Sequence, residues 1–274
     1  MQPTAKVEML DLQRARGEID LAVVAGKLDR FYQSGSSKIF LPKTYATTLE
    51  AVLVNTAGGL TGGDEFDVKL AAYGDTHLTV STQTAERVYR ALGPDTAKMR
   101  IEITLTGPAT LHWLPQETIM FDGAGFSRNL DVKMDQGASF FASEIMVFGR
   151  TAMRETVTKG RVFDQWRIHR SDKLIHAEAL RLEGDIVGKL DHLASAAGCV
   201  SFATTIFIGR DSDEKASAVC EFFKTYHDIK TAVSAWDGKL VVRSVGGDTA
   251  RLKKVIARFI EQFRQIENPR VWNY

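Results

Sequence analysis

The sequence EFDVKL at residues 65–70 alternates apolar and polar side chains, so that Phe66, Val68 and Leu70 share one face if the segment is a β-strand. The sequence MRIEITL at residues 99–105 repeats this period of two. Similar runs, each bounded by Gly, Asp or Pro, occur at residues 78–80, 130–134 and 140–148. We therefore predict a series of short strands from about residue 46 to residue 186. Some are apolar on both faces, which is typical both of a sandwich core and of a parallel sheet.

The pattern changes after about residue 198. Residues 200–208 and 239–245 are predicted to be strands, and residues 213–226 a helix. The strongest helical signal lies at residues 248–267, where apolar side chains recur every three or four positions and Asp248 with Thr249 supplies N-cap chemistry.

These patterns together predict a mainly β fold. We expect a β body over about residues 20–197 and a C-terminal β/α segment over about residues 198–274, whose helices cover one face of the body. We find no internal repeat and no linker rich in Pro, Gly or Ser that would divide the chain. The expected organisation is therefore one domain over residues 1–274.

The composition of the chain limits its expected cellular location and its expected binding partners. The 35 basic and 34 acidic residues almost cancel, which argues against a nucleic acid or an anionic membrane as partner. Cys199 and Cys220 have neither the spacing of a disulfide framework nor that of a zinc site, so a reducing compartment is expected. Charged residues interrupt the first 20 positions, which argues against a signal peptide, and no apolar run is long enough to span a bilayer. We expect a cytoplasmic protein.

The sequence lacks the usual signatures of catalysis. It contains no GxSxG elbow, and its six histidines form no HxH, HxxH or HExxH pair. His169 and His176 are an odd number of positions apart, so on one continuous strand they would face opposite sides of the sheet. The pattern favours a protein that is not an enzyme and that holds no tightly bound cofactor.

The glycine-rich sequence AGGLTGGD at residues 57–64 suggests a phosphate loop at first sight. A P-loop needs Lys followed by Ser or Thr after the glycines, and here a strand pattern follows instead. We interpret the glycine pairs as a tight corner between strands, where positive φ angles or close backbone approach are required. A binding loop is the alternative.

Four ordered segments point to a family. They are NTAGGLTGGD at residues 55–64, TQTAERVYR at 82–90, LPQETIMF at 114–121 and EIMVFGRTAMRE at 144–155. Together with PRVW at residues 269–272, they resemble the motif set of the urease accessory protein UreD (UreH) family. The resemblance covers about residues 41–185 and the tail. Many members carry Pro-Pro where this chain has Thr56 and Ala57, and Gly where it has Arg154.

The resemblance implies a β-rich scaffold for nickel insertion into apo-urease, a chaperone of metallocentre assembly without a reaction of its own. Its expected partners are a UreF-type accessory protein, a UreG-type GTPase bound through UreF, and apo-urease. Ni²⁺ would contact the chain only transiently. The residues also leave open a β-scaffold enzyme that uses Asp64, Glu117 or Glu144 as paired carboxylates, and a plain β structural module.

The motifs supply the candidate residues for partner binding or a nickel path. They are Gly58, Gly59, Gly62, Gly63, Asp64, Thr82, Gln83, Arg87, Tyr89, Arg90, Gln116, Glu117, Glu144, Arg150 and Glu155. The ordinary alternatives are ion pairs for the arginines and turn caps or ion pairs for the carboxylates. Arg87 and Arg90 would be one turn apart if residues 84–92 were helical. On the last helix, four basic side chains are expected to face solvent or a partner: Arg251, Lys254, Arg258 and Arg264.

Overall fold

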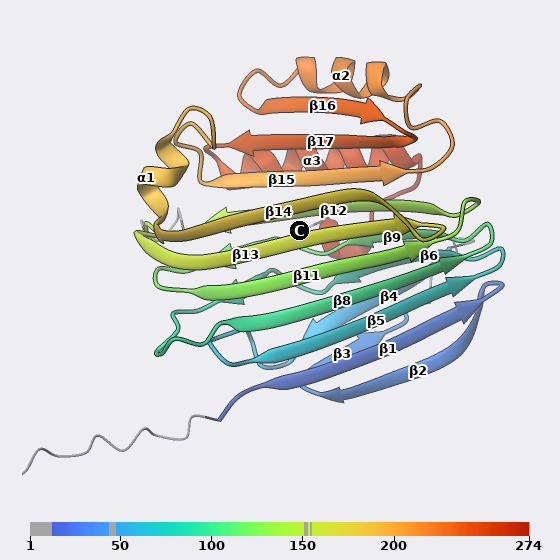
Figure 1. Cartoon of the computed structure of the whole chain (residues 1–274), viewed down its shortest axis with the longest axis horizontal. Coiled ribbons are helices and arrows are strands. Elements are labelled where there is room, and N and C mark those ends of the chain that lie inside the picture. The colour runs from blue at the N-terminus through green and yellow to red at the C-terminus, as the bar shows by residue number, and fades with distance from the viewer. Residues whose placement is uncertain (1–12, 44–47, 151–152, 154, 274) are drawn as a thin grey trace, which may run out of the picture.

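A computed structural model of the chain, which describes residues 13–43, 48–150, 153 and 155–273, shows two β-sheets facing each other (Figure 1). The first sheet has seven strands, in the spatial order β14 (Lys173–Asp185), β13 (Lys159–Arg170), β11 (Gly125–Met134), β8 (Ala97–Thr106), β5 (Glu65–Tyr73), β1 (Arg16–Val24) and β2 (Lys27–Gly35).

The second sheet has ten strands. Eight follow the order β16 (Lys230–Trp236), β17 (Lys239–Gly246), β15 (Ser201–Ile208), β12 (Ser139–Phe148), β9 (Thr110–Leu114), β6 (His77–Thr82), β4 (Leu49–Asn55) and β3 (Ser37–Phe40). The short strands β10 (Thr118–Met120) and β7 (Glu86–Val88) continue from β12 beside this row. The prediction of a mainly β fold is confirmed.

From β4 to β13 the chain alternates between the two sheets, apart from the short β7 and β10. Strands β4, β6, β9 and β12 are parallel neighbours in one sheet, and β5, β8, β11 and β13 are parallel neighbours in the other. The arrangement is that of a β-solenoid, in which each coil contributes one strand to each sheet. The strands therefore belong both to a sandwich and to parallel sheets, which explains runs that are apolar on both faces.

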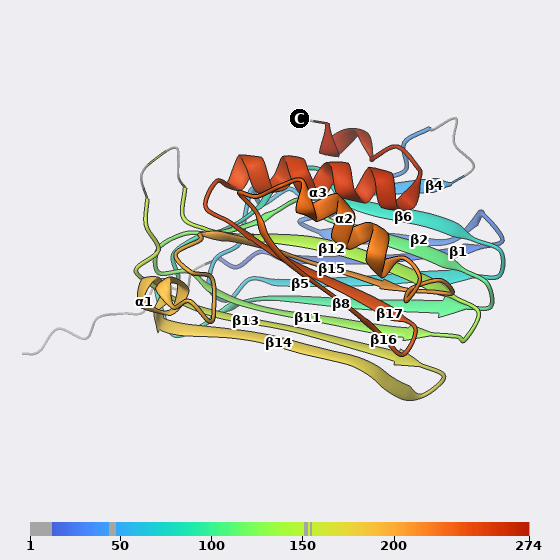
Figure 2. The same ribbon diagram turned by 90° about the horizontal axis from the view of Figure 1, so that it is seen from above.

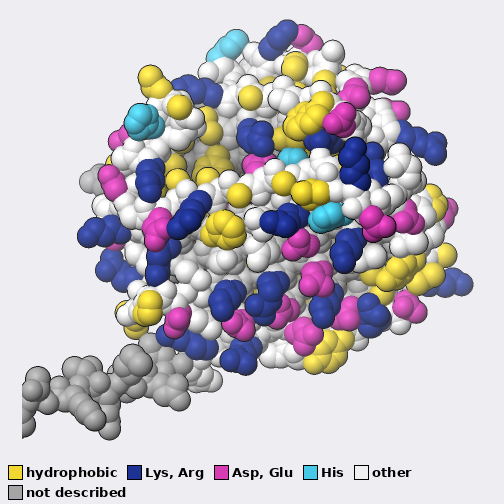
Figure 3. Space-filling model, in the orientation of Figure 1, with side chains coloured by type: hydrophobic (Ala, Val, Ile, Leu, Met, Phe, Trp, Pro, Cys, Tyr) yellow, Lys and Arg dark blue, Asp and Glu magenta, His cyan; other side chains and the backbone are white. Residues whose placement is uncertain are grey.

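The space between the sheets holds the main core. The predicted inward faces of β5 and β8 lie there, with Leu70, Ile101 and Ile103 almost fully buried. On the surface seen in Figure 3, basic and acidic side chains are interspersed, in keeping with the near-neutral composition. Among the residues that the structure describes, no helix combines the length and apolar character needed to cross a bilayer.

The C-terminal segment extends the ten-stranded sheet with β15, β17 and β16, and its helices α2 (Ala216–Lys224) and α3 (Thr249–Arg264) cover the outer face of that sheet (Figure 2). The apolar stripe of α3, including Val255, Ile256 and Phe259, packs on Phe141 and Ile145 of β12. Strand β12 is therefore covered on both sides. The expected covering of one face by these helices is confirmed.

Several local predictions need correction. The segment expected as helix 213–226 is helical only over α2, and a short helix α1 (Ile186–Asp191) was not predicted. Residues 84–92 are not helical, because this segment contains β7 and pairs with neighbouring strands. The strands that were not identified individually are β1, β2, β3, β4, β7, β9, β10, β13, β14 and β16.

Arg264 does not face solvent or a partner as predicted. Helix α3 ends at this residue, followed by Gln265 in the left-handed region with φ of 54°. The Arg264 guanidinium turns back to donate to the carbonyl of Glu267 at 3.1 Å and to Oδ1 of Asn268 at 2.9 Å. Terminal helical and post-helical carbonyls need donors, which this side chain supplies. Arg251 pairs with Asp228 at 2.7 Å, whereas Lys254 and Arg258 are exposed.

The N-cap of α3 supports a stability prediction. Oδ1 of Asp248 accepts a hydrogen bond from the Arg251 amide at 3.0 Å, so Asp248→Ala should lower the free energy of unfolding by about 1 kcal/mol. Urea denaturation followed by circular dichroism would measure it. The exposed Gln262→Ala on the same helix is the control and should change stability little. Equal effects of the two changes would show that this cap contributes nothing.

Candidate functional site

Three of the motif segments begin at the last residue of a strand, and the fourth begins within the neighbouring strand. The first starts at the last residue of β4, the second at the last residue of β6 and the third at the last residue of β9, while the fourth begins within β12. These four strands are parallel neighbours, so their carboxyl ends lie at the same edge of the sheet. The solenoid therefore brings together segments that are far apart in sequence.

Backbone hydrogen bonds then join the motifs side by side in their sequence order. The Leu60 amide donates to the Arg87 carbonyl at 2.7 Å, which joins the glycine-rich segment to the second motif. The Phe121 amide donates to the Val88 carbonyl at 3.0 Å, and the Gly149 amide donates to the Met120 carbonyl at 2.8 Å. The four segments form one continuous patch of backbone.

Side chains cover this patch and form a surface at the end of the sandwich. The Tyr89 hydroxyl donates to the Gly58 carbonyl at 3.1 Å, and its ring lies edge-on against Phe121 with centroids 4.9 Å apart. The Arg150 guanidinium lies 4.3 Å from the centroid of the Phe121 ring. We call this the motif surface and define it by Gly58, Tyr89, Arg90, Leu92, Phe121, Arg150, Met153 and Glu155.

The glycines have the conformations expected of a tight corner. Gly58, Gly59 and Gly63 have φ angles of 77°, 147° and 92°. A Cβ on Gly59 would meet the Tyr89 ring and lie 2.7 Å from the Arg87 carbonyl oxygen. Gly62 lacks a positive φ, but its backbone packs closely against Asp95. The structural interpretation of the glycine pairs is confirmed, and a binding role stays a prediction.

The predicted carboxylates do not gather in one place. Asp64 is buried and accepts amide hydrogen bonds from Ala15 and Thr61, both at 2.8 Å, so it acts as a turn cap. Glu117 pairs with Lys253 of α3 at 2.8 Å.

Four further charged candidates have partners: Arg90, Glu144, Arg150 and Glu155. Arg90 pairs with Asp122 at 2.8 Å, and Arg150 pairs with Glu155 at 2.6 Å on the motif surface. Glu144 lies between the sheets, where it accepts a hydrogen bond from the Trp113 indole at 2.5 Å. Arg154 of the fourth motif lies outside the described residues.

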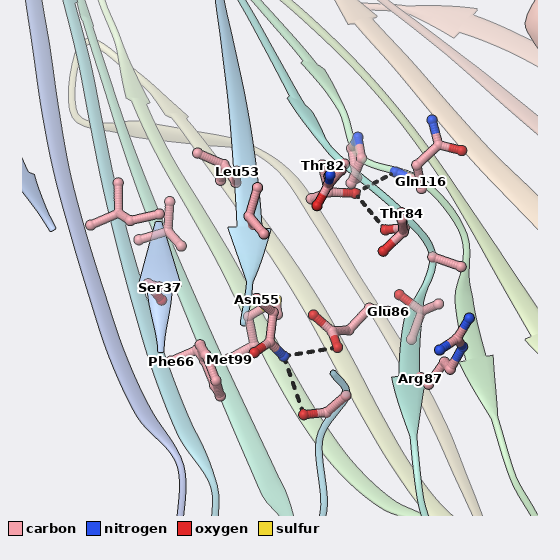
Figure 4. A pocket seen from close by; sticks show the side chains of 18 of the residues that line it. Ser37, Leu53, Asn55, Phe66, Thr82, Thr84, Glu86, Arg87, Met99 and Gln116 are labelled. Atoms are coloured by element: carbon pink, nitrogen blue, oxygen red, sulfur yellow. Dashed lines mark hydrogen bonds between the residues drawn. The ribbon is translucent and has the colours of Figure 1, made fainter. Parts of the chain in front are cut away.

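A cavity of about 110 Å³ lies beside the motif surface (Figure 4). Side chains from the first three motifs line it, among them Thr82, Gln83, Arg87 and Gln116. The side-chain Nε2 of Gln116 donates to the Val271 carbonyl at 2.9 Å, and the Trp272 indole donates to the Leu114 carbonyl at 2.9 Å. The tail motif therefore holds the third motif segment in place at the side of this cavity.

Glu86 in this cavity was missed by the sequence analysis. Its Oε1 accepts a hydrogen bond from the Asn55 side-chain amide at 3.1 Å, and burial raises the pKa of Glu86 to about 7. The residue stands in the second motif between Ala85 and Arg87, so its place in the motif was the available signal.

Arg128 and Asp164 were also missed. The Arg128 side chain is buried and pairs with both Glu144 and Asp164. Neither lies in a motif segment, so no local pattern marked them. Within the described ranges, no group of three or more His, Cys, Asp or Glu residues is arranged to hold a metal ion.

Comparison with known proteins gives a consistent result. A family described as UreD urease accessory protein matches residues 13–273. The chain is 42% identical over 266 residues to urease accessory protein UreD of Rhizobium leguminosarum bv. trifolii (strain WSM2304), covering 95% of this chain and 96% of that relative. It is 40% identical over 263 residues to the same-named protein of Agrobacterium fabrum, covering 95% and 91%. The resemblance drawn from the motifs is confirmed.

Two adjacent glycines provide a matched pair of variants. Both have positive φ angles, but a Cβ on Gly58 would meet nothing within 4 Å, whereas a Cβ on Gly59 would collide with Tyr89 and Arg87. Gly59→Ala should therefore be less stable than Gly58→Ala by about 1–3 kcal/mol, the cost of overpacking. Thermal or urea unfolding of the two variants would measure the difference. Equal stability would contradict the close packing of this corner.

The pKa of Glu86 predicts a pH-dependent stability. The folded protein holds the Glu86 proton up to about pH 7, whereas the unfolded chain releases it near the ordinary value of 4.5. The free energy of unfolding of the unmodified protein, compared with that of Glu86→Gln, should therefore fall as the pH rises from about 4.5 to 7. The decrease should be at most about 1.4 kcal/mol per pH unit. Urea unfolding of both proteins at several pH values tests this. A difference independent of pH would contradict it.

Proposed function

We propose that this chain, which belongs to the UreD family of urease accessory proteins, is a scaffold for nickel insertion into apo-urease. A role in urease maturation follows from the family. The further proposal is that the chain binds a UreF-type accessory protein, and through it a UreG-type GTPase, and docks on apo-urease in the cytoplasm. Ni²⁺ is the cargo of that assembly, and its contact with this chain is transient.

The convergence of the four motifs on one surface carries this proposal. Exposed apolar side chains stand on the motif surface beside charged ones: Leu92 is 77% exposed and Met153 is 68% exposed. Tyr89 and the arginines Arg90 and Arg150 lie among them. Aromatic residues, Met and Arg are enriched at protein interfaces, and exposed apolar groups surrounded by polar residues mark such sites.

The separation of the carboxylates favours a scaffold over the enzyme alternative. General acid–base catalysis by two carboxylates needs both within reach of one substrate. Asp64 caps a turn, Glu117 pairs with a helix lysine on the outside of the sheet, and Glu144 is enclosed between the sheets. The three carboxylates from which a catalytic pair would be drawn thus lie in three separate environments.

A co-purification experiment tests the proposed docking. Leu92→Asp places a charge on the motif surface without removing a packed side chain, and we expect retention of the UreF-type partner or of apo-urease to fall at least tenfold. The control is Leu174→Asp, an exposed leucine 45% accessible at the start of β14. Strand β13 runs from the motif surface to the turn that precedes Leu174. The control position therefore lies far from the motif surface.

Circular dichroism would first establish that both variants are folded. The control should retain partner within about twofold of the unmodified chain, since an isolated surface change is energetically small. If the folded, unmodified chain retains neither the UreF-type protein nor apo-urease, the scaffold proposal is wrong. If both variants bind equally well, docking takes place on another surface.

A further inference from the structure

Strand β14 forms one edge of the seven-stranded sheet and has a neighbouring strand only on the side of β13. The facing sheet continues past this edge with β17 and β16, as Figure 1 shows. Arg243 of β17 reaches Glu178 of β14 at 2.7 Å, so the two sheets remain in contact at the step between them. An eighth strand beside β14 would therefore lie over a surface that the chain already supplies.

Every second residue of β14 directs its main-chain hydrogen-bonding groups to the open side. Arg161, which lies opposite Glu183, donates its amide to the Ala124 carbonyl at 2.9 Å, toward β11 and away from β14. Opposed residues of an antiparallel pair either exchange both hydrogen bonds or direct both sets of groups outward. Glu183 therefore faces the open side, where its carbonyl accepts from the Lys189 ammonium.

The same direction applies to Ala177, Ala179 and Arg181, because their pairing with β13 continues to Glu183 without a register shift. All three residues are exposed. In the described part of the chain, no group forms a hydrogen bond with the main chain of these residues on the open side. Three N–H groups and three carbonyls thus stand free along one edge.

This stretch lacks the devices that usually protect a sheet edge, which are prolines, bulges and covering segments. Strand β14 contains no proline, and the register shift of its pairing with β13 lies before residue 177. On that side Lys239 Nζ donates to the Ile175 carbonyl at 2.5 Å, and on the other side Lys189 covers Glu183. Lysines therefore cap carbonyls at both ends of the stretch and leave residues 177–181 open.

A second cavity, of about 310 Å³, lies beside the open stretch. Leu180 and Leu182 of β14 line it from one sheet, and Phe202 and Val245 line it from the other. Alternate side chains of a strand point to the same face, so a strand beside β14 would direct every second side chain toward this cavity. Free main-chain groups beside an apolar pocket are the features by which proteins bind an added strand.

The charge at one end of the stretch limits the sequence of such a strand. Lys189 is exposed and pairs with no carboxylate among the residues that the structure describes. Arg243, in contrast, is already neutralised by Glu178. An acidic residue at the end of the added strand would give Lys189 an ion pair.

We propose that β14 binds an extended segment of another protein, which adds as an eighth strand along residues 177–181. The segment directs apolar side chains into the cavity lined by Leu180, Leu182 and Phe202, and it carries an acidic residue beside Lys189. This inference does not depend on the proposed role in urease maturation.

A fluorescein-labelled heptapeptide of sequence DTLTLTD tests the proposal by fluorescence anisotropy with the full chain. Its leucines share one face of a strand, and an acidic residue at each end allows binding in either direction. Methylation of one alternate set of its amide nitrogens should weaken binding at least about tenfold, because those N–H groups donate to β14. Methylation of the other set should change binding less than about twofold. Equal loss of binding for both sets would overturn the proposal.

A variant of the edge itself gives a second test. Ala179→Pro removes one free N–H group and should weaken peptide binding at least about tenfold, whereas Ala179→Ser keeps that group and should bind within about twofold of the unmodified chain. Proline is tolerated where the N–H of an edge strand faces solvent, so circular dichroism should show a folded protein. Unchanged binding by folded Ala179→Pro contradicts the proposal. The methylated peptides test it without any change to the chain.

The acidic end is tested by replacing both aspartates of the peptide with asparagine, which should weaken binding about three- to tenfold at low salt. Lys189→Gln should remove this difference, whereas Lys254→Gln, on the exposed side of α3, should retain it. An undiminished difference in Lys189→Gln would contradict the acidic end. Sedimentation tests the alternative occupant: a dimer of the unmodified chain that Ala179→Pro dissociates would show that a second copy occupies this edge, and the proposal would be wrong.

Discussion

The buried guanidinium of Arg128 connects the two sheets at the centre of the molecule. It comes from β11 in one sheet and pairs with Asp164 of the same sheet and with Glu144 of the facing sheet. Arg128 also lines both the cavity beside the motif surface and the larger cavity at the β14 edge. Removing one partner of such a group leaves a buried charge and typically costs about 3–5 kcal/mol. Arg128 thus joins strands of the two facing sheets beside these cavities.

The alternation of strands between the sheets explains how motifs that follow one another along the chain form one surface. Each coil returns to the same edge, so the segments after β4, β6 and β9 meet the second half of β12 in sequence order. The tail adds to this arrangement from the opposite end of the chain, since Trp272 donates to the Leu114 carbonyl. A rigid stack of parallel strands thus presents loops in fixed positions, which suits a protein that binds other proteins.

The local features could be predicted from the sequence, and the long-range ones could not. Alternation marked β5 and β8, the apolar stripe and Asp248 marked α3, and paired glycines marked the positive φ angles at Gly58 and Gly59. Periodicity does not reveal to which sheet a strand belongs, so the solenoid was not foreseen. The pairing of Arg128 with Glu144 and Asp164, and the burial of Glu86, depend on strands distant in sequence. Arg264 was misplaced because the exact end of α3 decides where it points.

The most direct test of the scaffold role is activation of urease in cells that lack any protein of this family. Apo-urease, a UreF-type protein and a UreG-type GTPase would be expressed with and without this chain, and both the nickel bound per purified urease and the ureolytic activity would be measured. We expect nickel content and activity to rise together only when the chain is present. Equal nickel content and activity in its absence would contradict a role in metal insertion.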